Sequence, residues 1–227
     1  MTAIQQIPQA DDFKLLLRDS LQRETLNSFA IKVERHCKVY ASGDPGDTIY
    51  FIDSGQIKLL MHSSEGKECL LAIHSAGDIF GELSLSRIGA RSETATAMKT
   101  TILKQVPCAQ FFKILKRASL LEGFVHYLVV RVAEQQQVIA NLVTVNSEQR
   151  LGQTLLQLGR TMGKKEPNSI RIELRVSHEE LSEMVGTTRP RISSFMRRFH
   201  ISGLIETNRD FFIIKEKKLT DYLAQIS

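Results

Sequence analysis

Apolar residues near the start of the chain recur at the spacing of a helix. Over residues 12–30 they fall at mixed three- and four-residue intervals, at Phe13, Leu15, Leu16, Leu21, Leu26 and Phe29. Such spacing gathers the apolar side chains on one helical face. We therefore predict a helix over 12–30.

The pattern changes to short alternating runs between about 31 and 108. The clearest runs, separated by turn residues, are IYFI (49–52), QIKLLM (56–61), ECLLAI (68–73) and TILKQV (101–106). The interruptions contain Gly-Asp pairs, as in GDPGD at 43–47, and these residues suit tight turns. Strands of this length and spacing predict an antiparallel barrel or jelly roll.

Helical spacing returns from 109 to about 145, with a heptad stripe. β-branched residues occupy one heptad position and mostly leucines the position three residues later: Val125, Val132 and Ile139, then Leu121, Leu128, Gln135 and Leu142. This choice favours a parallel two-stranded coiled coil. A long helix packed on its own domain is the alternative. We favour a dimer because the stripe runs for more than three heptads.

The third part of the chain, 146–227, mixes helices and short strands. We predict a helix over 151–163 that ends at Gly163, a strand over 170–176 and a closing strand over 211–216. The segment GKKEPNS between the first two is interpreted as a polar turn, and the lysine-rich residues 215–218 as a solvated tail.

Between these strands lie the signals of a helix-turn-helix. Ser177 and Glu180 form a capping box that opens one helix. Gly186 permits a tight turn, after which Thr187 or Thr188 caps a second, amphipathic helix. Two short helices joined by a glycine turn are typical of DNA-binding proteins.

The second helix carries basic and hydroxyl side chains on its open face. Between Gly186 and His200 there are four arginines and no acid. Arginine can donate two hydrogen bonds to guanine in the major groove. The residues better placed for phosphates are Thr187, Thr188, Arg197 and Arg198. A solvated basic face is the alternative. The predicted DNA-binding residues are Thr187, Thr188, Arg189, Arg191, Ser193, Ser194 and Arg197.

The composition of the chain indicates where the protein resides and which partners it can have. The 227 residues carry a formal net charge of +5, which permits a nucleic-acid partner without establishing one. Neither a signal peptide nor a membrane span is recognised, so we expect a cytoplasmic protein with no membrane partner. The three scattered cysteines, Cys37, Cys69 and Cys108, are interpreted as reduced, buried thiols.

Two other classes of protein are alternatives to a DNA-binding regulator. A metal-dependent cupin enzyme needs clustered histidines and a carboxylate, which the sequence lacks, so we expect neither an enzyme nor a metal site. A sensor subunit that regulates another protein needs no arginine-rich recognition helix. The arginine-rich segment 186–200 therefore favours a DNA-binding regulator over a sensor subunit.

The predicted barrel also contains a group of residues that are suited to bind a small ligand. Gly81 and Glu82 are followed, nine residues later, by Arg91 and Ser92. Glycine lets backbone N–H groups approach an anion. Glu82 can accept from a sugar hydroxyl, while Arg91 and Ser92 can bind a phosphate. A β-turn with a surface Glu–Arg ion pair is the alternative.

The arrangement resembles the family of the cyclic-AMP receptor protein and the fumarate–nitrate reductase regulator (CRP/FNR) over about residues 12–215. The motifs that carry the resemblance are G-D-P-G-D (43–47), I-x-x-G-x-I-K (52–58), E-G-K-E (65–68), G-D-x-F-G-E-L-S-L (77–85), R-S (91–92) and R-x-x-x-T-L-L (150–156). The resemblance implies an α+β protein in three parts. These are a cyclic-nucleotide-binding jelly roll at 1–108, a dimerisation helix and linker at 109–145, and a winged helix-turn-helix at 146–227.

The resemblance also implies the ligand-binding residues, which are Gly81, Glu82, Leu83, Ser84, Arg91, Ser92, Gln135 and Gln136. The two glutamines stand where the cyclic-AMP receptor has a ligand-facing Thr-Ser pair. Glutamine can still pair with a purine edge, so cyclic AMP (cAMP) is the expected effector. Cyclic di-GMP, another effector and DNA binding without ligand are the alternatives. Haem held by His74 and Cys69 is not favoured.

The resemblance to the CRP/FNR family also concerns the residues expected to read DNA bases. Arg189 matches the family arginine that reads guanine, whereas Pro190 and Ser194 depart from the receptor's base-reading residues. A different operator is therefore expected. A two-fold dimer predicts an imperfect palindrome in double-stranded DNA, and RNA polymerase is the expected protein partner.

Overall fold

The structure is a computed structural model and describes residues 10–23, 29–62, 68–86, 89–173, 176–208 and 211–226. The chain divides into two compact units, Met1–Gln136 and Gln137–Ser227. Helix α3 (Leu121–Thr144) begins in the first unit and ends in the second. Each unit is described on its own.

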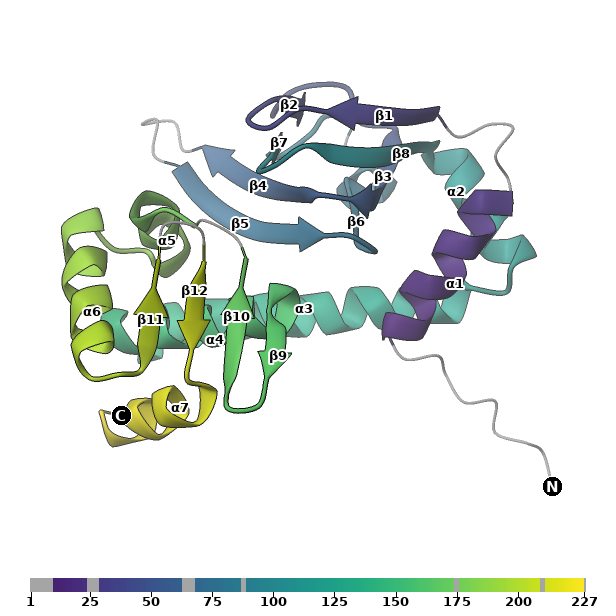
Figure 1. The fold of residues 1–227 in the computed structure, drawn as a ribbon. Coiled ribbons are helices and arrows are strands. Elements are labelled where there is room, and N and C mark those ends of the chain that lie inside the picture. Colours follow the sequence, from purple (N-terminus) through teal and green to yellow (C-terminus); the bar gives the residue numbers. More distant parts are fainter. Residues whose placement is uncertain are drawn as a thin grey trace. The chain divides into compact units, whose positions relative to one another are not determined.

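The first unit contains two four-stranded antiparallel sheets that face each other as a jelly roll, which confirms the predicted fold (Figure 1). One sheet has the order β1 (Phe29–Val33), β8 (Thr101–Pro107), β3 (Thr48–Ser54), β6 (Ile79–Phe80). The other has the order β2 (Lys38–Tyr40), β7 (Thr94–Ala97), β4 (Gln56–His62), β5 (Glu68–Ser75). All four predicted runs lie in strands.

The barrel core consists of the inward side chains of both sheets. Ile57, Leu59, Ala95 and Ala97 from the second sheet pack with Ile52 and Leu103 from the first. In β4, Ile57 and Leu59 point inward on either side of half-buried Lys58, as a sheet with one buried face requires, and the pairing register shifts at the next residue, Leu60. Burial of these side chains supplies the main driving force for the barrel.

Helices α1 (Ala10–Arg23) and α2 (Cys108–Arg117) lie at one end of the barrel (Figure 1). The prediction of a helix to residue 30 is wrong at its end, because Phe29 and Ala30 belong to β1 and pair with β8. Leu26 lies outside the described residues. The run Phe29–Val33 alternates, and its pairing with the sheet overrides the local helical spacing.

The helical segment predicted over 109–145 is two helices rather than one. It breaks between α2 and α3, where Ser119 has a φ of 53°. The turn lets Phe111 of α2 pack edge-on against Phe124 of α3, with ring centroids 5.3 Å apart. Tertiary packing of two aromatic rings thus explains a break that the heptad spacing did not indicate.

Helix α3 buries one face and leaves an apolar stripe exposed. Phe124 and Tyr127 are buried against the barrel end, and Leu128 is partly packed there. Val125, Val129, Val132 and Ile139 are each at least half exposed. The side chain of Leu142 lies outside the described set. Leu128 therefore packs partly on its own unit, while most of the predicted seam is open.

The second unit is a winged helix, as predicted. Its sheet has the order β11 (Ile205–Thr207), β12 (Phe212–Ile214), β10 (Ser169–Ile172), β9 (Lys164–Glu166). Helix α4 (Ser147–Met162) covers one face of the sheet (Figure 1). The helix-turn-helix is α5 (His178–Val185) and α6 (Arg189–Ile201), and α7 (Glu216–Gln225) closes the unit.

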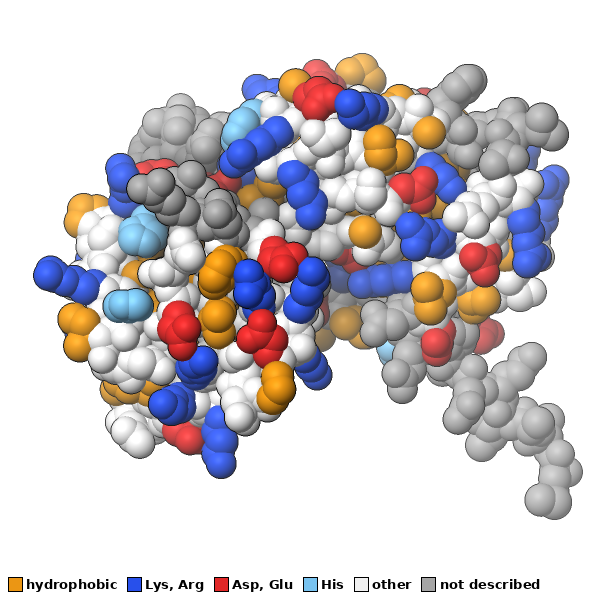
Figure 2. Space-filling view, viewed as in Figure 1, with side chains coloured by type: hydrophobic (Ala, Val, Ile, Leu, Met, Phe, Trp, Pro, Cys, Tyr) orange, Lys and Arg blue, Asp and Glu red, His pale blue; other side chains and the backbone are white. Residues whose placement is uncertain are grey.

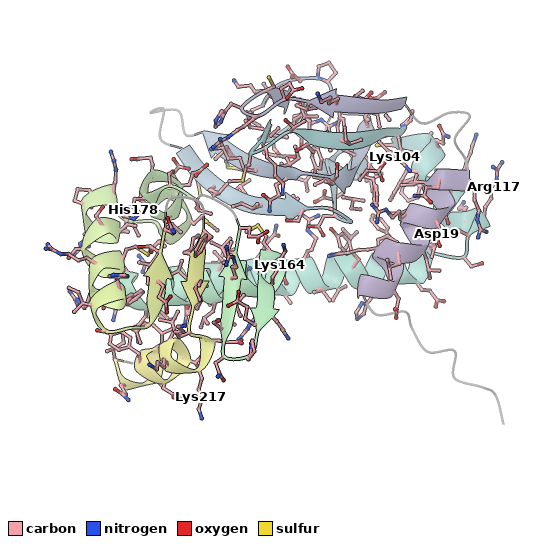
Figure 3. All side chains as sticks on the ribbon, viewed as in Figure 1. Asp19, Lys104, Arg117, Lys164, His178 and Lys217 are labelled. Carbon is pink, nitrogen blue, oxygen red and sulfur yellow. The ribbon has the colours of Figure 1, made fainter. Side chains whose placement is uncertain are left out.

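Three predictions for this unit are corrected. The strand expected over 170–176 ends at Ile172, and the polar turn before it contains β9. Strand β11 was not predicted. The lysine-rich segment is not a tail but the start of α7, with Lys217 pointing away from the sheet (Figure 3). Leu219 and Leu223 are buried one turn apart and hold α7 in place.

The interpretation of the cysteines as buried is also wrong. Cys37 and Cys69 are exposed and Cys108 is half-buried, while all three thiols in the described chain are free. Cys69 sits next to buried Leu70 in β5 and therefore faces outward. Within the described ranges, no helix combines the length and apolarity needed to cross a membrane.

Candidate ligand and DNA sites

Arg91 is a buried cation at the centre of the predicted ligand site. Its Nη1 donates to the carbonyl oxygen of Gly81 (3.1 Å) and to Ser84 Oγ (2.6 Å), and its Nη2 donates to the Thr48 carbonyl (2.6 Å). Only 5% of the residue is exposed. Its Nε is buried without a partner among the described residues. A buried guanidinium with an unmet donor is suited to receive an anion.

Gly81 must be glycine for this arrangement to form. Its φ is +78°, and a Cβ would lie 2.7 Å from Arg91 Nη1 and 3.1 Å from the Thr48 carbonyl oxygen. Both the positive φ and the close approach exclude a side chain. The short 3₁₀ helix at Glu82–Ser86 follows directly.

Three aromatic side chains form the inner wall beside Arg91. The Arg91 guanidinium carbon lies 4.2 Å from the Tyr40 ring centroid and 5.6 Å from that of Tyr50. Tyr50 in turn stacks on Phe80 with centroids 5.0 Å apart. Cation–π contact helps to keep the buried charge in place.

Glu82 pairs with α3 rather than with Arg91. Arg131 Nη1 lies 2.9 Å from Glu82 Oε1, and both side chains are largely buried. Burial works against the charge on Arg131, but Glu82, together with Tyr127 and Asp78, outweighs it and raises the pKa of Arg131. Glu82 Oε2 is buried without a partner in the described chain. The alternative of a surface Glu–Arg pair therefore does not describe this site.

His74 completes the contact between the barrel and α3. Its Nε2 lies 3.3 Å from Arg131 Nη2, and its Nδ1 lies 3.9 Å from Asp78 Oδ2. Burial, aided by Arg131, lowers the pKa of His74 to about 4. The ring is therefore neutral at neutral pH and accepts from the arginine.

The predicted ligand residues are brought together only in part. Gly81, Glu82, Ser84 and Arg91 adjoin one another, with Ser84 half-buried. Leu83 and Ser92 are exposed, as are Gln135 and Gln136 on α3. The glutamines follow Arg131 by about one helical turn, so they lie close to the point in the middle of α3 where Arg131 pairs with Glu82.

The helix-turn-helix forms from the local signals in the sequence. The Ser177–Glu180 capping box is present, and Gly186 ends α5 with a φ of 64°. Thr188 occupies the N-cap of α6 without a side-chain capping bond. Ile192, Met196 and Phe199 are buried, which holds α6 against its own unit.

The opposite face of α6 is open. Thr188, Arg189, Arg191, Ser194 and Arg197 are exposed, and Thr187 is half-buried. Ser193 is half-buried because its Oγ lies 2.9 Å from Nδ1 of His178, which Figure 3 labels at the start of α5. Arg189 Nε lies 3.9 Å from Glu179. Arg198 is held by Glu148 at 2.7 Å.

Basic side chains on the face drawn in Figure 2 are spread over both units with acidic ones between them. On the face drawn, surface charge alone therefore does not single out one part of the molecule. Helix α6 differs from the mixed surface because its residues Arg189–Ile201 include four arginines and no acidic residue.

The comparisons with known proteins agree with this geometry. Residues 30–118 match the model of the cyclic nucleotide-binding domain, and residues 149–222 match that of the Crp-like helix-turn-helix domain. The chain is 30% identical to the global nitrogen regulator of Synechocystis over 82% of its own length and 81% of that protein. It belongs to the CRP/FNR family of transcription regulators.

Other members of the CRP/FNR family resemble the chain over a similar span. The CRP-like cAMP-activated global transcriptional regulator of Mycobacterium tuberculosis is 28% identical over 79% of this chain and 81% of that protein. The solved structure of the c-di-GMP-responsive regulator CLP of Xanthomonas campestris has a TM-score of 0.71 at 19% identity. That match covers 87% of this chain and 98% of CLP. The last likeness shows the shared fold.

Sequence reasoning missed several residues of this CRP/FNR site. Arg131 contacts both Glu82 and His74, which lie on different elements, and Tyr40 and Tyr50 support Arg91. The one signal in the sequence was an arginine within the apolar stretch of α3. Among the described residues, no group of three or more His, Cys, Asp or Glu is placed to hold a metal ion.

The buried His74 predicts a pH-dependent stability for this regulator. The unfolded chain takes up a proton below pH 6.5, whereas the folded chain resists protonation of His74 until about pH 4. The free energy of unfolding should therefore fall by roughly 3 kcal/mol as the pH drops through this window. Urea denaturation at a series of pH values measures it.

The matched variants are His74→Gln, which can still accept from Arg131, and His36→Asn at an exposed position. His74→Gln should flatten the pH dependence of unfolding between pH 6.5 and 4. His36→Asn should retain it. An unchanged slope in His74→Gln would show that other groups carry the effect.

Proposed function

We propose that this regulator is a homodimer that binds cAMP in the jelly roll and, when the ligand is bound, recognises an imperfect palindrome in double-stranded DNA. The observation that supports ligand binding most directly is that the buried Arg91 guanidinium has an Nε without a partner among the described residues. In this proposal residues 1–108 sense the ligand, 109–145 dimerise and 146–227 bind DNA.

Two buried polar atoms without a partner among the described residues match groups of a cyclic nucleotide. Arg91 Nε can donate to a phosphate oxygen, and Glu82 Oε2 can accept from a ribose hydroxyl. The cyclic nucleotide supplies an anion and a hydroxyl donor, which together match this pair. Ser84 and the Gly81 backbone border the same space, and Leu83 and Ser92 flank it on the chain.

Glu82 also connects the site to the dimerisation helix. Through Arg131 it fastens α3 to the barrel, so a ligand that engages Glu82 alters a contact that holds α3. Gln135 and Gln136, about one turn further, offer amide groups to a base. A ligand can shift the protein between two states only by its differential affinity for them, and this contact is where that difference arises.

Cyclic di-GMP is the second candidate effector. The exposed Gln135 and Gln136 replace the Thr-Ser pair of the cyclic-AMP receptor, which leaves the identity of the base open. The fold is shared with a c-di-GMP-responsive regulator. The intact Gly81–Glu82 and Arg91–Ser92 pairs favour a single cyclic nucleotide over this larger dianion.

The exposed stripe of α3 supports the homodimer. Val125, Val132 and Ile139 present apolar surface at one heptad position, with Val129 one helical turn after Val125, and burying such a stripe against its own copy forms a coiled coil. A two-fold dimer places two α6 helices on half-sites about one turn of DNA apart. RNA polymerase is the protein partner we propose for the DNA-bound form.

Selection from a random DNA library tests this function. The full-length protein is incubated with the library in the presence of cAMP, of cyclic di-GMP or of neither. We expect an inverted repeat to be enriched with cAMP alone. Enrichment with cyclic di-GMP supports the second effector, equal enrichment without ligand rejects ligand control, and no enrichment at all rejects sequence-specific binding.

Arg189→Ala is expected to weaken binding to the selected operator by about 1–3 kcal/mol, or roughly 5- to 150-fold, and to relax the preference at one base pair of each half-site. The reason is that Arg189 is exposed near the start of α6, where recognition helices meet base edges. Fluorescence anisotropy with operator variants measures both effects.

Arg197→Ala is the matched comparison. It removes an exposed arginine further along α6 that suits a phosphate, so affinity should fall equally for all DNA sequences. The slope of the logarithm of affinity against the logarithm of salt concentration should become shallower by about one. If Arg189→Ala behaves in the same way as Arg197→Ala, Arg189 does not read a base.

A further inference from the structure

Glu93 is a buried carboxylate directly beside the anion site. It is 2% exposed. Its Oε1 accepts a hydrogen bond from Tyr40 Oη at 2.8 Å, and its Oε2 accepts one from Ser92 Oγ at 2.6 Å. Neither the Gly81–Glu82 and Arg91–Ser92 motifs nor the proposed function gives this residue a role.

One of its two donors, Tyr40, also contacts Arg91. The Tyr40 ring lies under the Arg91 guanidinium at 4.2 Å, so one aromatic ring links the buried cation to the buried carboxylate. Burial and the Glu93 charge raise the pKa of Tyr40 well above its usual value, so the phenol keeps its proton and donates it to Glu93.

Ser92 is engaged in the same way. A serine hydroxyl has one proton to donate, and here it goes to Glu93. While that bond is kept, Ser92 cannot donate to an anion bound at Arg91. The carboxylate also adds a negative charge close to the position that a phosphate would occupy.

We propose that Glu93 sets the affinity of the ligand site by withholding the Ser92 hydroxyl and by opposing negative charge next to Arg91. This inference rests on the proposed function and deepens it. An anionic ligand must either break a charge-assisted hydrogen bond to gain Ser92 or bind without it. The wild-type site is thereby weaker than its Arg-Ser pair alone would make it.

Glu93→Gln tests the mechanism with little change in shape. The amide oxygen can accept from Tyr40 while the amide nitrogen donates to Ser92 Oγ, which reverses the second bond and releases the serine proton. Calorimetry should show that the Kd for cAMP falls about tenfold, as expected for one charge-assisted hydrogen bond. Glu34→Gln, at an exposed glutamate of the same unit, should leave the Kd unchanged.

A double-mutant cycle separates the hydroxyl from the charge. Ser92→Ala should weaken cAMP binding about tenfold more in the Glu93→Gln protein than in the wild type, because only there does the hydroxyl reach the ligand. Equal costs in both backgrounds, or weaker binding by Glu93→Gln in a folded protein, would overturn the inference.

Inorganic phosphate provides a probe that does not depend on the nucleotide. Its stabilisation of the protein against thermal unfolding should be larger for Glu93→Gln than for wild type or Glu34→Gln at equal ionic strength. If no variant binds cAMP but phosphate stabilises Glu93→Gln selectively, the proposed function fails and the role of Glu93 stands. If neither probe distinguishes Glu93→Gln from wild type, the role of Glu93 is rejected.

Discussion

Replacing Arg91 with alanine is expected to weaken cAMP binding at least about 100-fold while the protein remains dimeric. The substitution removes the buried charge that faces the ligand, and truncation of one partner of a buried charge pair costs 2–5 kcal/mol or more. It also leaves the carbonyls of Gly81 and Thr48 without their donor. Equilibrium dialysis with labelled cAMP measures the affinity.

Two further variants make the Arg91 result interpretable. Arg91→Lys keeps the charge but loses the guanidinium fork, so its affinity should lie between those of wild type and Arg91→Ala. Arg117→Ala, at an exposed arginine that ends α2, should bind cAMP as the wild type does. Undiminished binding by a folded Arg91→Ala protein would remove Arg91 from the ligand site.

The double substitution Val125→Glu with Val132→Glu is expected to break the homodimer. Both side chains are at least half exposed on α3 and lie one heptad apart, so each protomer would bring two carboxylates into the proposed seam. Burying unpaired charges is costly, and the dimer dissociation constant should rise at least 100-fold. Sedimentation velocity measures the mass, and operator affinity should fall with it.

Leu15→Glu is the control for this pair. Leu15 is 62% exposed on α1 and is not part of the heptad stripe. A charge there should leave the sedimentation coefficient unchanged. If the double variant also remains a dimer, the exposed stripe of α3 is not the dimer interface.

Local signals explain why much of the architecture could be predicted. The strands of the jelly roll alternate over single runs, and the capping box at Ser177 needs only the four residues to Glu180. Gly186 sets a turn through its own φ. Each of these features is decided within a few residues, where propensity and side-chain capping act.

Contacts between distant elements explain what could not be predicted. Glu82 and Arg131 are 49 positions apart in sequence, and no pattern indicates that they form a buried pair. Helix α1 ends early because Phe29 and Ala30 pair with β8. The break before α3 likewise depends on Phe111 meeting Phe124.

Helix α7 is a different case, because a local signal was present. Leu219 and Leu223 stand four residues apart and are both buried, yet the lysines before them suggested a solvated tail. Leu223 packs where a Cβ on Gly152 would lie, 2.5 Å away. The charged residues face outward on a helix whose apolar side closes the domain, as amphipathic helices do.

Calorimetric titration of the wild-type protein with cAMP tests the central claim most directly. Two temperatures are used, because the enthalpy of binding can pass through zero at one of them. The arrangement of Arg91, Gly81 and Glu82 predicts saturable binding in the micromolar range with one ligand per protomer. Absence of heat at both temperatures would contradict cAMP as the effector of this site.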